Sequence, residues 1–411
     1  MRTTKNNEHK KLNVPNKQEQ NQICLDSAER EGLSTKGNVP NLRFPEFQEE
    51  WEESTIGEEF DLYSGNTPSR LNKEHFNGAI NWISSGELKE HYIADTKEKI
   101  SDEAAKTLKM LPIGTFVIAI YGLEADGVRG TGSITKTEAT ISQACMAFTS
   151  KGKVQNEFLY SWYKKHGNVI GIRYAQGTKQ QNLCYDIIEK FKIAYPTFQE
   201  QEKLNKFIAL LDERIATQNK IIDKLQSLIR GISSRIFASI QGIEYRMGDI
   251  VTITNGNSNV QDAVIQSKDG LYPFFDRSDD IKYLPTFLFD KEAIIYPGEG
   301  TEFMPRYFKG KFALHQRCYA IFDFNEIINA RFLYFYLKTR NSYFVKNAVG
   351  STVPSLRLDT FQKLKVIIPP KKIQHSVSLC LSSIEQKCNV EKKILHKLLK
   401  QKQYLLRQMF M

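Results

Sequence analysis

The sequence lacks the features that mark membrane, secreted and metal-binding proteins. Its apolar runs, such as Phe116–Tyr121, are far shorter than the ~20 residues that a membrane-spanning helix needs. The charged N-terminus, MRTTKNNEHKK, is not followed by the apolar segment of a secretory signal. The six cysteines form no CxxC pair and have no His-x-x-x-His motif near them, which argues against zinc. Scattered cysteines fit a reducing compartment, so we expect a cytoplasmic protein.

Signatures of catalysis are missing as well. Gly127–Gly132 lacks the GxxxxGK[ST] order of a phosphate loop, and Ile368-Pro369-Pro370 lacks the polar first residue of an amino-methyltransferase motif. Glu391-Lys392-Lys393 has the ExK spacing of some nucleases but falls in a predicted helix seam. The seven histidines form no metal-ligand pattern, and His75 and His91 fall in predicted loops. We therefore expect a non-catalytic chain with no metal or cofactor of its own. An enzyme with an unrecognised nuclease or methyltransferase centre is the alternative.

What the chain does have is length and positive charge. Its 411 residues suffice for two or three domains with buried cores. Lys and Arg number 57 against 47 Asp and Glu, which gives a formal net charge of +10. Such a balance is typical of proteins whose partner is a polyanion such as nucleic acid.

The second half of the chain repeats the first. A shift of 173 residues superimposes identical or similar residues near the ends of the two halves. The matched segments are Gln143-Ala144-Cys145 with Gln316-Arg317-Cys318, Gly177-Thr178 with Gly350-Ser351, Leu183 with Leu356, Asp186 with Asp359, Lys190–Ile193 with Lys363–Val366, Pro196 with Pro369, and Gln201 with Gln374. Upstream the register changes, and Ser64-Gly65-Asn66 resembles Asn255-Gly256-Asn257. We interpret the chain as two copies of one unit, roughly 42–240 and 243–411.

Both copies have a mixed pattern of strands and helices. Gly114–Tyr121, Met146–Phe148, Ala293–Tyr296 and Cys318–Phe322 are expected as buried strands. Phe158–Tyr163 and Phe332–Leu337 are expected as short helices. Each unit is therefore predicted to be of mixed α and β structure.

Each copy ends in a long helix with a heptad pattern. Thr197–Glu200 has the sequence of a capping box, and apolar residues then recur in steps of four and three, the period of a coiled coil. The expected seam is Leu204, Ile208, Leu211, Ile215, Gln218, Ile222, Leu225 and Ile229 in the first helix, and Val377, Leu381, Ile384, Glu391, Leu395 and Leu398 in the second. The polar Gln218 and Glu391 hold equivalent positions, where a polar residue can fix the register. The alternative is two unrelated amphipathic helices, each packing on its own domain.

The segment between the helices favours antiparallel pairing. The first seam alone spans roughly 50 Å at 1.5 Å per residue. The intervening domain has an expected radius of gyration of ~14 Å, so it cannot easily bridge the far ends of two parallel helices. We therefore predict an α+β protein with a polar, disordered tail at 1–40 and mixed α/β domains at 41–198 and 243–370. Helices at 199–242 and 371–411 would form an antiparallel, pseudo-two-fold coiled coil.

Several segments resemble the specificity subunits of type I restriction-modification systems. The opening Val39-Pro-Asn-Leu-Arg-Phe-Pro-Glu-Phe47, followed by Trp51 and Ile56-Gly57, is similar to the start of these subunits. The unit endings carry the same likeness, through Gly177-Thr178, Asn182-Leu183, Ile193, Pro196 and Gln201, and again through Gly350-Ser351-Thr352, Leu356, Ile367, Pro369 and Gln374. The second copy departs from the pattern in reading Lys371-Lys372-Ile373 before Gln374, where an acidic residue is usual. The resemblance covers roughly residues 39–411.

The resemblance implies a function that agrees with the residue patterns. Two target-recognition domains would each read one half of an asymmetric, bipartite sequence in double-stranded DNA. The helix pair would set their spacing and dock two modification subunits, which would use S-adenosylmethionine to methylate adenine. Two restriction subunits would add cleavage driven by ATP, with Mg as their metal. This chain would itself hold none of that chemistry and would not contact a membrane.

Loop residues with hydrogen-bonding side chains are the candidates for DNA contact. Arg and Gln can make bidentate base contacts, whereas Lys, Ser and Thr more often hold phosphates. The candidates are Ser84, Ser85, Arg129, Gln143, Thr178, Lys179 and Gln180 in the first unit, and Arg277, Arg306, His315, Gln316, Arg317, Ser351, Thr352 and Arg357 in the second. For each residue the alternative is a solvated surface position, and for His315 a structural histidine. For the whole chain, a coiled-coil scaffold that binds only protein is a further alternative.

Overall fold

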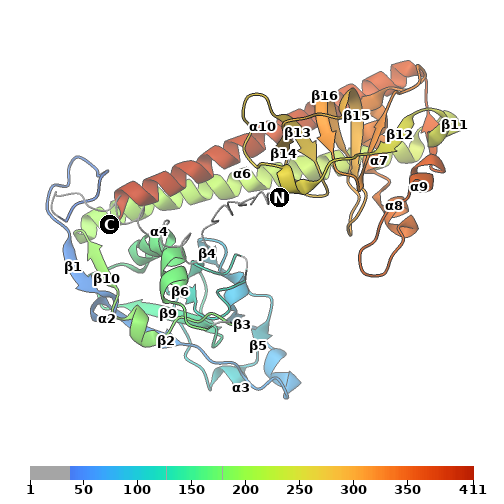
Figure 1. The fold of residues 1–411 in the computed structure, drawn as a ribbon. Coiled ribbons are helices and arrows are strands. Elements are labelled where there is room, and N and C mark those ends of the chain that lie inside the picture. The colour runs from blue at the N-terminus through green and yellow to red at the C-terminus, as the bar shows by residue number, and fades with distance from the viewer. Residues whose placement is uncertain (1–37, 126, 178) are drawn as a thin grey trace, which may run out of the picture. The chain divides into compact units, whose positions relative to one another are not determined.

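The fold comes from a computed structural model, which describes residues 38–125, 127–177 and 179–411. The chain divides into two compact units. Unit 1 runs to Arg214 and includes Leu398–Met411, and unit 2 is Ile215–Lys397. Two long helices, α6 (Phe198–Ser239) and α10 (Lys371–Met409), contribute residues to both units (Figure 1). Most of the tail predicted at 1–40 lies outside the described residues.

Unit 1 is built on three small sheets. β1 (Glu52–Thr55) pairs with β10 (Lys192–Tyr195) in an antiparallel ladder. The largest sheet has the order β2 (Phe60–Ser64), β9 (Cys145–Ser150), β6 (Phe116–Ala119), β7 (Gly132–Thr135) and β4 (Tyr92–Ile93). The third has the order β5 (Lys99–Ile100), β3 (Ile80–Ile83) and β8 (Ala139–Ile141). Short helices are α2 (Ile56–Glu59), α3 (Asp102–Ala105) and α5 (Tyr185–Ile188).

One face of the largest sheet of unit 1 is covered by α4 (Asn156–Tyr174), which packs on β6, β7 and β9. This helix is longer than the Phe158–Tyr163 segment predicted from sequence, because the less apolar second half of the helix continues past the buried aromatic cluster. Phe116, Phe148 and Phe158 are fully buried at this contact. The aromatic side chains of the helix therefore form part of the core of unit 1, together with residues of the sheet.

Unit 2 has the same kind of framework. β11 (Ile243–Arg246) pairs with β18 (Lys365–Ile368), again antiparallel. The main sheet has the order β12 (Thr252–Asn255), β17 (Cys318–Phe322), β15 (Phe289–Pro297), β16 (Arg306–Leu314), β13 (Tyr272–Phe275) and β14 (Lys282–Leu284). α7 (Ala330–Lys338) packs on β15 and β16, and α8 (Asn341–Asn347) and α9 (Leu358–Gln362) follow it.

The two units share one strand topology. The order β2-β9-β6-β7 in unit 1 corresponds to β12-β17-β15-β16 in unit 2, and β5-β3-β8 corresponds to β14-β13-β16. β8 pairs parallel with β3, as β16 does with β13. The long strand β16 of unit 2 thus occupies the positions that β7 and β8 hold in unit 1. The repeat seen in the sequence is therefore a repeat of the fold.

A buried glutamine joins the same elements in each unit. Gln201 is fully buried near the start of α6, and its Nε2 donates to the carbonyl oxygens of Pro196 and Lys153, both at 2.9 Å. Its Oε1 accepts from the amide of Gln155 at 2.9 Å. Gln374, also fully buried, repeats this pattern in α10 with Pro369, Ile327 and Asn329. In each unit one amide therefore satisfies three backbone groups and fixes the long helix to the domain.

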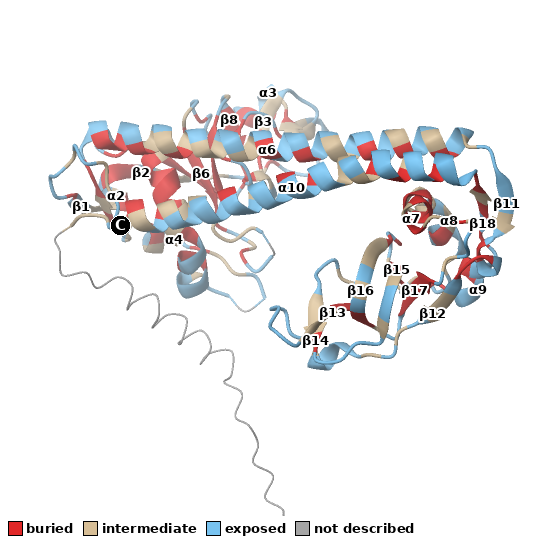
Figure 2. Cartoon of the chain, turned by 90° about the horizontal axis from the view of Figure 1, so that it is seen from above, coloured by how far each residue is buried: buried red, intermediate tan, exposed pale blue. Residues whose placement is uncertain are grey.

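The predicted seam residues of α6 and α10 are all buried or partly buried. Figure 2 shows buried and intermediate residues recurring along both helices. Ile222, Ile229 and Cys388 form a small apolar cluster in unit 2. Next to it, Gln218 Nε2 donates to Glu391 Oε2 at 2.6 Å and to the Glu391 carbonyl oxygen at 3.1 Å. The two polar seam residues thus satisfy each other.

Candidate nucleic-acid interface

In unit 2, two candidate loops leave the sheet at the same edge. The parallel strands β13 and β16 end side by side, with Phe275 opposite Leu314. The amide of His315 donates to the Phe275 carbonyl oxygen at 2.9 Å, which ties the two loops together. The loops 276–280 and 315–317 therefore bring Arg277 close to His315, Gln316 and Arg317.

A third loop joins them through the end of β15. Gly350 has φ +105°, a conformation that favours glycine, and opens the tight loop 350–354. The amide of Gly300, just after β15, donates to the carbonyl oxygen of Pro354 at 3.0 Å. Glu299 forms an ion pair with Arg317. Ser351 and Thr352 are exposed on this loop, and Arg357 is exposed shortly after it.

Unit 1 repeats this arrangement with different side chains. β3 and β8 end together at Ile83 and Ile141, and the amide of Ser142 donates to the Ile83 carbonyl oxygen at 2.9 Å. Ser84 and Ser85 follow β3, while the exposed Gln143 follows β8. The three candidates thus lie at one edge of the sheet.

The glycine loop of unit 1 also matches that of unit 2. Gly177 has φ +106°, and the amide of Leu123 donates to the Gln181 carbonyl oxygen at 3.0 Å. Gln181 Oε1 accepts from Arg129 Nη2 at 2.8 Å, so Arg129 supports this loop. Lys179 and Gln180 are exposed on it. Thr178, another candidate, lies outside the described residues.

The candidates differ in what their side chains already bind. Arg129 and Arg317 pair with side chains of their own unit, and Arg306 donates to backbone carbonyl oxygens of Asp276 and Ser278. Burial, together with the guanidinium groups of Arg317 and Arg277, lowers the pKa of His315. A neutral His315 agrees with its Nδ1 accepting from the Arg317 amide at 3.2 Å. Gln143, Lys179, Gln180, Arg277, Gln316, Ser351, Thr352 and Arg357 are exposed.

Sequence reasoning missed a buried ionic cluster in unit 1. His91, expected only as a loop residue, lies between the rings of Tyr92 and Tyr160, with centroids 4.1 and 4.0 Å away. Its Nε2 lies 2.8 Å from a carboxylate oxygen of Glu157, and its Nδ1 lies 3.0 Å from one of Asp212. Asp212 of α6 also pairs with Lys402 of α10. A single histidine has no sequence signal for such a role.

Unit 2 has a related cluster without a histidine. Glu385 of α10 accepts from Tyr334 Oη at 2.7 Å and from Lys338 Nζ at 2.9 Å. Tyr334 and Lys338 are four residues apart on α7, as Tyr160 and Lys164 are on α4. In unit 2 a Tyr and a Lys of α7 thus bind an acid of the long helix α10, whereas in unit 1 His91 binds the acid of α6.

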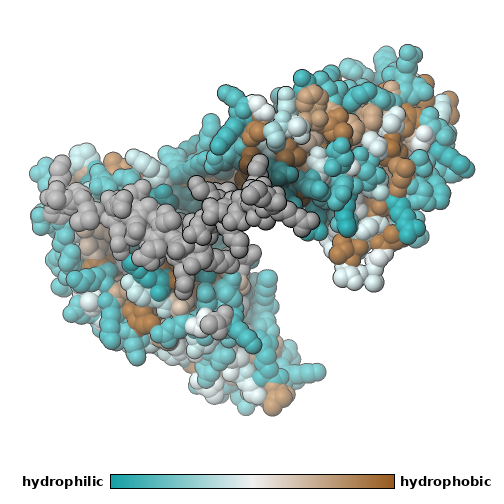
Figure 3. Space-filling view, in the orientation of Figure 1, coloured by the Kyte–Doolittle hydropathy of each residue, from teal (hydrophilic) through white to brown (hydrophobic). Residues whose placement is uncertain are grey.

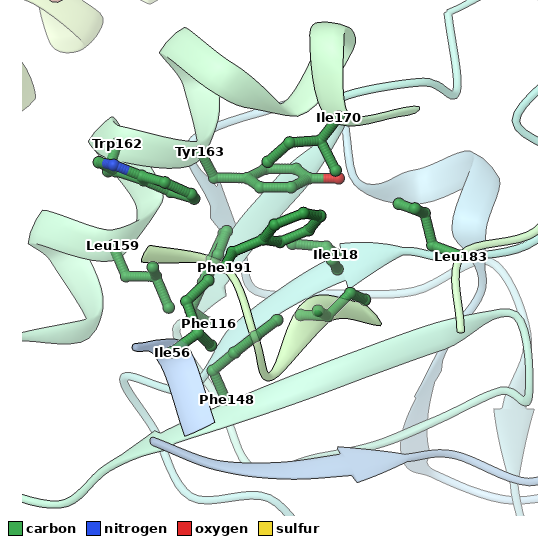
Figure 4. A pocket seen from close by; sticks show the side chains of 11 residues that line it. Ile56, Phe116, Ile118, Phe148, Leu159, Trp162, Tyr163, Ile170, Leu183 and Phe191 are labelled. Carbon is green, nitrogen blue, oxygen red and sulfur yellow. The ribbon is translucent and has the colours of Figure 1, made fainter. Parts of the chain in front are cut away.

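Other kinds of site find little support in the described part of the chain. No group of three or more His, Cys, Asp or Glu residues there could hold a metal ion. None of the described helices is long and apolar enough to cross a membrane. The apolar cavity under α4, lined by residues such as Phe116, Tyr163 and Phe191, measures about 10 Å³ and is too small for a ligand (Figure 4). Where grey atoms do not cover it, the face of unit 1 seen in Figure 3 is mostly hydrophilic, with scattered apolar residues.

Comparisons with known proteins give one consistent likeness. The family model of the type I restriction modification DNA specificity domain matches residues 48–227 and again residues 243–400. The type I restriction enzyme MjaIX specificity subunit of Methanocaldococcus jannaschii is 24% identical over an alignment of 394 residues, which covers 84% of this chain and 89% of that protein. The EcoDI specificity subunit of Escherichia coli is 28% identical over 138 residues, covering 34% of this chain and 30% of the relative.

A solved structure has the same fold. The crystal structure of a type I restriction-modification system S subunit from M. genitalium matches with a TM-score of 0.62 at 18% identity. The match covers 91% of this chain and 99% of that one.

Proposed function

The chain belongs to the type I restriction modification DNA specificity family, and from this premise we propose that each unit reads one half of an asymmetric, bipartite DNA target. As a specificity subunit, the chain is the non-catalytic, DNA-recognising member of its restriction-modification system. The candidate loops would make the contacts, with Arg and Gln at base edges and Lys, Ser and Thr at phosphates.

The observation that carries this proposal is one scaffold with two different sets of loop residues. At the end of β8 unit 1 presents Ser142-Gln143-Ala144, and at the end of β16 unit 2 presents His315-Gln316-Arg317. Different hydrogen-bonding groups at equivalent positions would select different bases. Two such readers in one chain would recognise an asymmetric target.

We further propose that α6 and α10 form an antiparallel, pseudo-two-fold coiled coil that acts as a spacer. Asp212 and Gln218 of α6 contact Lys402 and Glu391 of α10, and Phe237 further along α6 belongs to the same core cluster as Leu381 of α10. The α10 partners thus fall in number as the α6 residues rise, which supports antiparallel pairing. Gln218 and Glu391 are equivalent under the shift of 173 residues, and they contact each other. A pseudo-two-fold axis brings equivalent residues together where it passes between them.

The same helices would dock the partner subunits. Leu210 and Leu228 of α6 and Leu379 of α10 are 57%, 48% and 61% exposed, although they lie on otherwise amphipathic helices. Exposed apolar side chains on helices are suited to helix-on-helix contacts with other proteins. Two modification subunits using S-adenosylmethionine and two restriction subunits using ATP and Mg would complete the system, in the cytoplasm.

The deciding experiment is single-molecule sequencing of host DNA methylation with and without the gene for this chain. We expect an N6-methyladenine pattern on a two-part, interrupted motif that disappears with the gene. If a functional modification subunit is present and its methylation is unchanged without this chain, the proposal is wrong.

The two-reader model makes its own prediction for Arg317. Arg317→Ala should weaken or relax recognition of one half-site only, because Arg317 belongs to unit 2. Losing one good bidentate contact would reduce discrimination by ~1–3 kcal/mol. An equal loss at both half-sites would contradict the model.

A further inference from the structure

The loop after β13 has a buried, charged anchor. Asp276 is 3% exposed, and its Oδ1 accepts from the amide and the hydroxyl of Ser278 at 2.8 and 2.5 Å. Its Oδ2 accepts from Lys282 Nζ at 2.6 Å. Burial alone would raise the pKa of Asp276, but the hydrogen bonds from Lys282 and Ser278 outweigh burial and lower it. Asp276 is therefore a carboxylate that folds its own loop.

Arg306, which the sequence suggested as a DNA contact, is directed at this loop. Its guanidinium lies 5.1 Å from the centroid of the Phe275 ring. Nη1 donates to the Ser278 carbonyl oxygen at 2.8 Å, and Nη2 donates to that of Asp276. A planar guanidinium suits two carbonyl acceptors, so Arg306 holds both ends of a three-residue turn centred on Arg277.

We propose that loop 276–280 is a specificity loop of the half-site read by unit 2, and that Arg306 is a positioning residue that sets its shape. This inference rests on the proposed function. The loop exposes one guanidinium, on Arg277, and two carboxylates, on Asp279 and Asp280. Arg is suited to guanine and Asp to the amino group of cytosine, whereas two carboxylates would repel phosphates. This set of groups therefore favours contacts with DNA bases over contacts with the phosphates of the DNA backbone.

The equivalent loop of unit 1 is built differently. There Glu87 takes the central role, accepting from the amide and hydroxyl of Ser84 at 3.0 and 2.6 Å and from the Lys97 amide at 2.7 Å. The contacts that fix Ser84 come from within its own segment, not from an arginine on a neighbouring strand. A change at Arg306 should therefore alter one half of the DNA motif and leave the other half unchanged.

The test measures the methylated motif in cells that carry the full-length chain with its modification subunit. Arg306→Ala should leave the first half of the motif intact and make the second half degenerate at one or more positions. Discrimination at those positions should fall about 5- to 150-fold, the equivalent of the ~1–3 kcal/mol of one bidentate base contact. Arg306→Lys keeps the charge and can reach one carbonyl oxygen, so it should restore part of the discrimination.

Two further variants keep the test decisive. Lys291→Ala removes another cation of the same sheet, whose ion pair with Asp323 is half-exposed, and should leave the motif unchanged. Arg277→Ala changes an exposed side chain and should relax the same half-site without affecting folding. If Arg306→Ala does not fold, Arg277→Ala alone tests whether loop 276–280 determines the second half of the motif.

The outcomes separate the inference from the function. If the wild-type chain directs no methylation motif, the proposed function fails. If the wild-type motif is present, the inference is overturned when Arg277→Ala leaves the second half unchanged. It is also overturned when folded Arg306→Ala leaves that half unchanged or relaxes both halves equally, or when Lys291→Ala relaxes it as strongly.

Discussion

Replacing His91 by Phe should lower the stability of unit 1 in a pH-dependent way. The phenyl ring keeps the stacking between Tyr92 and Tyr160 but cannot pair with the carboxylates of Glu157 and Asp212. The hydrogen bond between His91 and Glu157 would contribute ~1.5–3 kcal/mol as a bond to a charged group, and the ion pair with Asp212 adds to it. Both carboxylates keep other stabilisation, because Asp212 still pairs with Lys402 and the Glu157 side chain is 31% exposed. We therefore expect a cost of about 2 kcal/mol, or roughly 4–8 °C in melting temperature.

The direction of the pH dependence follows from the shift in the pKa of His91. Burial by itself would lower the pKa of His91, but its contacts with Asp212 and Glu157 outweigh burial and raise it. A raised pKa in the folded state means that the contribution is complete below the unfolded pKa of ~6.5 and is lost as the pH rises through the folded value. The difference between wild type and His91→Phe should therefore shrink as the pH rises from ~6.5 through the folded-state pKa of His91.

The assay is calorimetry of both full-length proteins across this range, with the difference between them as the readout. The difference matters because burial, with nearby Lys402, lowers the pKa of Lys164 to about 8. That shift makes stability rise with pH in both proteins between about pH 8 and the unfolded lysine value of ~10.4, and subtraction removes this rise where it overlaps the histidine effect. Lys338→Met, which breaks the related contact with Glu385 in unit 2, is the matched control and should show a constant cost. A wild-type advantage that does not change with pH would refute the reasoning.

Two further predictions concern the buried polar contacts of the long helices. Gln201→Ala and Gln374→Ala should each lower the free energy of unfolding by about 3 kcal/mol, because each leaves three backbone groups without their partner. Denaturant unfolding should show that each variant loses stability in its own unit. Gln218→Leu should lower the melting temperature because it leaves the Glu391 carboxylate facing an apolar side chain. Adding Glu391→Leu should restore it, and a double variant less stable than the single one would contradict this explanation.

The repeat of the fold could be predicted because its fixed points are set by geometry. Gln201 and Gln374 each satisfy three backbone groups, and Gly177 and Gly350 share a backbone conformation that disfavours other residues. Such positions accept few substitutions, so a constant shift of 173 residues reveals them in the sequence. The helices α4 and α7 match better at a shift of 174, which aligns Tyr160 with Tyr334. Because the shift differs there by one residue, the constant shift of 173 did not reveal that Tyr160 corresponds to Tyr334.

The candidate loops were predictable in position but not in the role of each side chain. Arg306 and Arg277 look alike in a sequence, and only the fold shows that Arg306 donates to carbonyl oxygens while Arg277 is exposed. His91 has no counterpart in unit 2, so the repeat could not indicate it. Its partners come from positions 66 and 121 residues away, which no local pattern connects.

The contrast between buried framework residues and exposed loop residues fits the proposal that one scaffold serves two different readers. A change at a buried framework residue such as Gln201 costs several kcal/mol, whereas an exposed loop residue such as Gln143 or Gln316 can usually change within about 0.5 kcal/mol. Loop residues can therefore diverge between the two units while the framework stays fixed. Arg306 lies between these classes, since it is partly buried yet its guanidinium hydrogen-bonds to loop backbone. Substituting it should alter what unit 2 reads more than how stably unit 2 folds.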